Sequence, residues 1–273
     1  MYQVEKFSNL PNHQSLIDRA TKVLIEDPRV IGLCIGGSQK ADEYSDVDLF
    51  VYCKTEEDRE SLKKDRLKIA EKVGEIKAES ISIFPYVYVV FYEEEEIKVD
   101  YSWHLLPEAN RPDKAHLDIL YDPEGHLKKL KEESTKLVWK IDEDELKHKT
   151  KHYHIGISYT VFKIARGELW DAQDAVDFYR KYLVEFEDIL AQRKRENYRK
   201  LEEKLGEEKL KKFNETLVRE ISRKEIFRAM DAVFNYFNEY LKDSIEKLNA
   251  FPYEQAEKMY EYYDRIKKLV LEN

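Results

Sequence analysis

Apolar and polar residues alternate in two ways along the first 120 or so positions of the chain. Apolar side chains at helical spacing predict one helix over residues 15–25 and a second, highly charged one over residues 56–73. The inner face of the second helix is expected to consist of Leu62, Leu67, Ile69, Ala70 and Val73. Runs rich in β-branched and aromatic residues predict strands at 30–37, 47–53, 79–84, 86–92 and 97–103, with 117–122 as a candidate edge strand.

From about residue 143 the pattern becomes helical, with apolar residues every three or four positions over residues 152–165, 171–192, 225–241 and 256–271. Breaks are expected near Gly167, Gly206 and Pro252. A chain of 273 residues exceeds the usual size of a single core, so two packed units are predicted. The predicted class is α+β: residues 1–138 form a mixed β-sheet flanked by helices, and residues 139–273 form a helical bundle.

Charge and composition narrow the classes of partner. The formal net charge is -9 and no basic stripe is present, which argues against nucleic acid and against an anionic membrane surface as partners. Cys34 and Cys53 lie inside apolar runs and are expected to be reduced, buried thiols. No apolar segment has the length of a membrane span or the form of a signal peptide, so we expect a cytoplasmic protein, either a monomer or a homodimer.

The stretch "IGGSQKADEYSDVDLF", residues 35–50, holds the candidate chemistry. Side chains alternate along a strand, so Asp46 and Asp48 project from the same face. At ~4 Å separation and an effective dielectric near 20, two such charges repel by roughly 4 kcal/mol, which requires protonation, a basic neighbour or a metal ion to offset it. Carboxylate oxygens suit Mg²⁺, which completes its shell with water and substrate phosphates.

The residues just before these aspartates favour a phosphate group. Gly36 and Gly37 let backbone N–H groups approach an anion closely, Ser38 adds a hydroxyl, and Lys40 offers a balancing cation. Asp100, on the predicted strand 97–103, is positioned to complete the metal ligands or to act as a general base. The sequence therefore predicts a nucleoside triphosphate held between phosphate donors and metal-binding carboxylates.

"GGS", seven residues, "DVD" and a later strand-borne aspartate together resemble the DNA polymerase β nucleotidyltransferase superfamily, in particular its aminoglycoside and lincosamide adenylyltransferases. The resemblance covers residues 30–103, with a spacer after "GGS" that is shorter than in many members. It implies transfer of AMP from ATP to a hydroxyl with release of pyrophosphate. Gly37 and Ser38 would then hold the triphosphate, and Asp46, Asp48 and Asp100 the Mg²⁺ ions. Residues 1–138 would be the catalytic domain and 139–273 the substrate-binding domain.

The acceptor is expected to be a small hydroxyl-bearing molecule, and the acidity of the chain suits a cationic, aminoglycoside-like one. Glu168, Trp170 and Asp174 are candidate acceptor contacts. Each also has a simpler explanation: the dipole favours acidic residues at a helix N-terminus, and Trp170 could belong to the interdomain core. His104, close after Asp100, is either a pocket residue or an ordinary hydrogen-bonded one. Two other functions remain open: a nucleotidyltransferase that modifies proteins, and an interaction module without catalysis.

Overall fold

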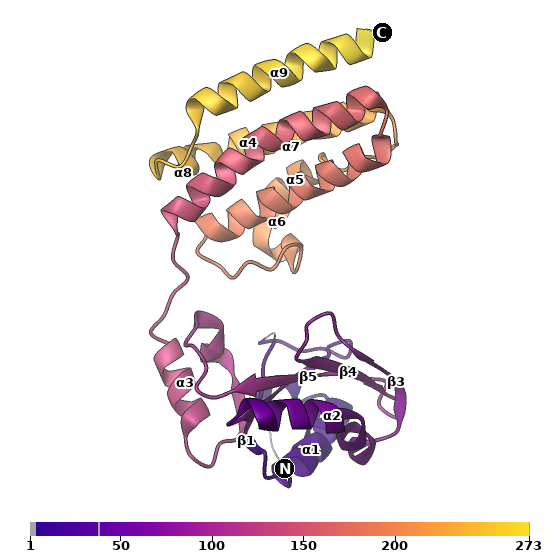
Figure 1. Cartoon of the computed structure of the whole chain (residues 1–273), viewed down its shortest axis with the longest axis vertical. Coiled ribbons are helices and arrows are strands. Elements are labelled where there is room, and N and C mark those ends of the chain that lie inside the picture. The colour runs from indigo at the N-terminus through magenta and orange to yellow at the C-terminus, as the bar shows by residue number, and fades with distance from the viewer. Residues whose placement is uncertain (1–3, 38, 273) are drawn as a thin grey trace. The chain divides into compact units, whose positions relative to one another are not determined.

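The fold is that of a computed structural model, shown in Figure 1, which describes residues 4–37 and 39–272. The chain divides into two compact units, residues 1–138 and 139–273. The first combines strands and helices, and the second is helical in all its regular elements within the described residues. The predicted α+β class is therefore confirmed.

Six strands form one sheet within the described residues, in the order β3-β4-β5-β2-β1-β6. Their bounds are β1 (Val30–Ile35), β2 (Val47–Cys53), β3 (Ile76–Ile81), β4 (Val87–Tyr92), β5 (Lys98–Leu105) and β6 (Asp118–Tyr121). The central pair, β2 and β5, is parallel, and the other neighbouring strands are antiparallel. The sheet is thus mixed, with the predicted edge strand β6 beside β1.

The two faces of this sheet differ in their cover. Helices α1 (Pro11–Ile25) and α2 (Glu56–Val73) pack on one face, against odd-numbered residues of β2 and β5 such as Leu49, Val51 and Tyr101. On the other face, α3 (His126–Ser134) packs near the 3-10 helix η2 (Pro112–His116). A small core there contains Tyr52 and Leu127. The rest of that second face carries the polar, even-numbered side chains of β2 and β5.

The helical unit contains α4 (Glu143–Arg166), α5 (Leu169–Leu190), α6 (Leu201–Asn214), α7 (Arg223–Tyr240), α8 (Lys242–Lys247) and α9 (Tyr253–Glu272). Helix α4 packs against α5 and α9, and α5 packs against α7. Their apolar stripes meet in one core, in which Tyr153 stacks on Phe237 with ring centroids 4.6 Å apart. None of the helices that the structure describes is both long and apolar enough to cross a membrane.

Several expectations about individual residues need correction. Leu67 is 42% exposed, so it does not belong to the inner face of α2. The strand expected at 79–84 ends at Ile81, because residues 82–86 make the turn into β4, where the Val87 N–H donates to the Phe84 carbonyl. Glu95, in the acidic turn between β4 and β5, is only 6% exposed at its side chain and pairs with Arg19 of α1. Cys34 and Cys53 are free and buried, as predicted.

Candidate metal and nucleotide site

Three aspartates meet on the open part of the sheet, at the start of the parallel pair β2 and β5. Asp48 lies directly beside Asp100 in the register of these strands, and Asp46 precedes β2 by one residue. Each offers a carboxylate oxygen, and these three atoms all lie within 4.8 Å of one another. All three residues are half-buried. The sequence pattern that singled them out therefore corresponds to a real cluster in space.

A lysine that the sequence analysis did not single out lies among these carboxylates. Lys98 Nζ is 2.8 Å from Asp46 Oδ2 and 3.1 Å from Asp100 Oδ2. Burial lowers the pKa of Lys98, but the two carboxylates outweigh it and hold that pKa above its ordinary value. The ammonium thus neutralises part of the charge that a metal ion would otherwise balance. Only its position two residues before Asp100, on the same face of β5, could have indicated it.

The glycine turn after β1 is built against the same aspartates. Gly37 has φ +78°, in the left-handed region, and a Cβ there would lie 2.2 Å from Asp48 Oδ2. A Cβ on Gly36 would lie 2.4 Å from the Phe50 ring. Both positions therefore require glycine because of close approach. The Gly36 N–H donates to the Asp48 carbonyl, so the sheet already uses that amide.

Buried groups from the N-terminal segment hold this turn and the loop before Asp46. Lys6, in the 3-10 helix η1 (Glu5–Phe7), donates from Nζ to the Gly36 carbonyl and lies 3.6 Å from Asp118 Oδ2. Burial lowers the pKa of Lys6, and Asp118 opposes this shift. His13 of α1 holds the Ser45 carbonyl at 2.8 Å from its Nε2. These contacts are long-range in sequence, so no local pattern could reveal them.

The donor set fits a hard divalent cation. All the ligand atoms that the three aspartates offer are carboxylate oxygens, the type that Mg²⁺ prefers. Asp100 Oδ1 is buried and has no hydrogen-bond partner among the residues that the structure describes. A buried acceptor without a partner is costly, and a metal ion would satisfy it. The residues that would hold the ion are therefore Asp46, Asp48 and Asp100.

The other predicted site residues are less closely tied to this cluster. Ser38 lies outside the described residues, and Lys40 is exposed on the loop that leads to Asp46. In the helical unit, Glu168 pairs with Lys163, while Trp170 is 76% exposed and Asp174 is exposed. Their roles in binding phosphate or acceptor stay predictions.

Comparison with known proteins adds little to this picture. No family model matches the chain, and no curated protein matches it. Among solved structures, a nucleotidyltransferase-like protein from Exiguobacterium sibiricum is similar, with 13% sequence identity and a TM-score of 0.40. The match covers 89% of this chain and 77% of that one. A likeness this weak does not assign a function, so the function has to be inferred from the residues of this chain.

Proposed function

We propose that the protein is a metal-dependent nucleotidyltransferase that transfers a nucleoside monophosphate, AMP from ATP in the leading case, to a hydroxyl group. The observation that carries the proposal is the meeting of Asp46, Asp48 and Asp100 from two adjacent parallel strands, with one buried oxygen unsatisfied. The glycine turn that lies against Asp48 supports it, because Gly37 and Ser38 would place a triphosphate beside the metal ligands. Lys40 would add a cation to that phosphate site.

Each residue has a defined part in this reaction. The three aspartates would hold Mg²⁺, which would supply positive charge to neutralise the phosphate oxygens. The turn at Gly37 orients the β- and γ-phosphates so that the acceptor oxygen approaches the α-phosphorus in line. A bond forms between that oxygen and phosphorus, the bond to the bridging oxygen of the β-phosphate breaks, and pyrophosphate leaves. Asp100 accepts the proton of the acceptor hydroxyl.

For the acceptor we propose a small hydroxyl-bearing molecule of the aminoglycoside or lincosamide kind. The net charge of -9 supports a cationic acceptor, since an acidic protein attracts one. Glu168, Trp170 and Asp174 are the residues of the helical unit proposed to contact it. The family resemblance of residues 30–103 supports this choice of acceptor as well.

The test is a screen of hydroxyl-bearing acceptors with ATP and Mg²⁺, reading pyrophosphate release and product mass. Asp48→Asn should reduce turnover at least a hundredfold, because it removes a metal ligand, whereas Glu43→Gln, on the exposed loop that precedes β2, should leave it unchanged. Titration with Mn²⁺ tests the metal site without knowledge of the acceptor. An Asp48→Asn variant that binds Mn²⁺ as tightly as the unaltered protein would refute the proposal. Label from α-labelled ATP on protein would instead favour a protein-modifying enzyme.

A further inference from the structure

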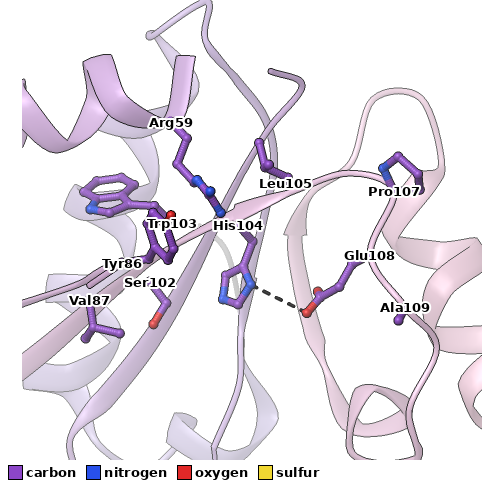
Figure 2. A pocket seen from close by; sticks show the side chains of 10 residues that line it. All are labelled: Arg59, Tyr86, Val87, Ser102, Trp103, His104, Leu105, Pro107, Glu108 and Ala109. Atoms are coloured by element: carbon purple, nitrogen blue, oxygen red, sulfur yellow. Dashed lines mark ion pairs between the residues drawn. The ribbon is translucent and has the colours of Figure 1, made fainter. Parts of the chain in front are cut away.

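A cavity of about 350 Å³ lies in the N-terminal unit at the end of β5 (Figure 2). Ser102 and His104 line it, and they project from the same face of β5 as Asp100 because side chains alternate along a strand. At ~3.4 Å per residue, their Cα atoms are about 7 Å and about 14 Å from that of Asp100. The cavity therefore lies farther along the same strand than the proposed metal site, at a distance that a nucleoside can span.

The charged groups around the cavity are already paired. On one side, Arg59 Nη2 donates to Glu56 Oε1 at 2.7 Å, within helix α2. On the other, the Glu108 carboxylate accepts from the Tyr52 hydroxyl at 2.7 Å and lies 2.8 Å from Lys114 Nζ, a nearly fully buried ammonium. Paired charges offer little to a phosphate or a polycation. An uncharged ligand suits this cavity better than either of them.

The shape of the lining favours a flat ligand. The Arg59 guanidinium lies 3.6 Å above the centre of the Tyr86 ring, and both residues line the cavity. A stacked guanidinium and phenol ring provide the kind of surface on which aromatic heterocycles stack. A sugar ring has no π system and can offer such a surface only its C–H groups. This wall therefore indicates a planar heterocycle rather than a carbohydrate.

The His104 ring is held in place at the cavity by its neighbours. It stacks on Tyr52 with ring centroids 5.1 Å apart. Its Nδ1 lies 3.6 Å from Glu108 Oε1, the ion pair that Figure 2 marks with a dashed line. Among the described residues, no hydrogen bond of its Nε2 is found. An imidazole fixed through one nitrogen can offer the other to a ligand. The Ser102 hydroxyl, two residues nearer to Asp100, is a second hydrogen-bonding group of the lining.

We propose that this cavity binds the base of the nucleotide whose phosphates are held at Asp46, Asp48 and Asp100, an inference that rests on the proposed function. The base stacks on the outer face of the Arg59 guanidinium, which itself stacks on the Tyr86 ring, and its polar edge bonds to His104 and Ser102. His104 lies too far along β5 to exchange a proton with the acceptor hydroxyl. It is therefore a positioning residue that contributes to nucleotide affinity and base preference.

Calorimetric titration with two probes tests this assignment without any acceptor. The first probe is an ATP analogue with a methylene bridge between the α- and β-phosphates, and the second is inorganic triphosphate, both with Mg²⁺. His104→Ala should weaken binding of the analogue five- to tenfold, the loss of one hydrogen bond and its packing, and leave triphosphate binding unchanged. Arg59→Lys, which keeps the charge but removes the planar group, should act in the same direction. His126→Ala, on the exposed start of α3, is the control.

The outcomes separate this inference from the proposed function. Asp48→Asn should weaken both probes, because both need the metal. If the unaltered protein binds triphosphate and the analogue equally well, the base contributes nothing and the cavity assignment is wrong while the nucleotidyltransferase proposal stands. If it binds neither probe, the proposed function fails and this inference fails with it. Should His104→Ala unfold, Arg59→Lys decides, and an equal loss for both probes would overturn the assignment.

Discussion

Replacement of Lys98 by methionine is the sharpest test of the metal site, because the lysine ammonium contacts the carboxylates that would hold a metal ion. Its ammonium lies 2.8 Å from Asp46 and 3.1 Å from Asp100. Because the three carboxylates lie within 4.8 Å of one another, each pair of unit charges repels by at least about 3.5 kcal/mol at an effective dielectric of 20. Mg²⁺ and Lys98 therefore compete for the same carboxylate groups.

The size of the effect follows from the exposure of the groups. Lys98 and Asp46 are each 40% exposed at their side chains, so solvent screens these contacts strongly. Two such ion pairs contribute roughly 1 kcal/mol together. Lys98→Met should lower the free energy of unfolding by that amount without divalent ions, and by nothing at saturating Mg²⁺, where the metal has displaced the lysine. By the same cycle, the variant should bind the metal about fivefold more tightly.

The assays are urea unfolding in chelator and in excess Mg²⁺, together with Mn²⁺ titration followed by electron paramagnetic resonance. Lys77→Met is a matched control, since Lys77 Nζ also lies between two carboxylates, 3.4 Å from Glu93 and 3.0 Å from Glu96, but on strand β3. Its stability change should not depend on metal, and its Mn²⁺ affinity should equal that of the unaltered protein. Weaker or unchanged Mn²⁺ binding in Lys98→Met would refute the competition between lysine and metal.

Three further variants test other parts of the fold. Gly37→Ala should cost about 1–3 kcal/mol of unfolding free energy and weaken Mn²⁺ binding, because its Cβ would clash with Asp48 Oδ2; unchanged denaturation and metal titrations would contradict this. Burial lowers the pKa of His154 from 6.5 to about 4. The free energy of unfolding should therefore fall by up to about 3 kcal/mol as the pH drops from 6.5 to 4. In urea unfolding measured against pH, His154→Phe should show a smaller decrease. Burial alone would raise the pKa of Glu108, but His104 and Lys114 lower that pKa to about 2. Glu108→Gln should leave the buried Lys114 charge without its partner. The free energy of unfolding should then fall by about 3 kcal/mol or more, which a lower melting temperature would show.

The local sequence pattern was sufficient to predict the bounds of an element when one face of that element packs on the core and clear residue signals mark its ends. The bounds of β2 and α2 are those predicted, residues 47–53 and 56–73. In β2, apolar and polar residues alternate as expected for a strand with one face on the core. Helix α2 begins after Thr55, whose side chain accepts a hydrogen bond from the Asp58 N–H, and ends before Gly74. Helix α1 begins at Pro11, four residues before the predicted start, because the polar residues of its first turn gave no apolar signal.

Long-range contacts explain what the sequence could not reveal. Helix α6 is rich in lysine and glutamate and was not predicted, since only a few apolar residues such as Leu205 and Phe213 reach the core. At the site, "GGS" and "DVD" carried a recognisable pattern, whereas Lys6 and His13 come from the N-terminal segment through tertiary folding. A cation that acts on a site from another element leaves no periodic trace in the sequence.

The register between β2 and β5 links the metal site and the cavity into one structural unit. Asp48 lies beside Asp100 in the strand register, and Tyr52 lies beside His104. The aspartate cluster and the imidazole therefore depend on the same alignment of two parallel strands. A slip of β5 by one residue would turn Asp100 and His104 together onto the face covered by α1 and α2, because side chains alternate with a period of two. The core residues Val99, Tyr101 and Trp103 would then lose their burial in the same step. The apolar core on one face of the sheet therefore specifies the positions of Asp100, Ser102 and His104 on the other face.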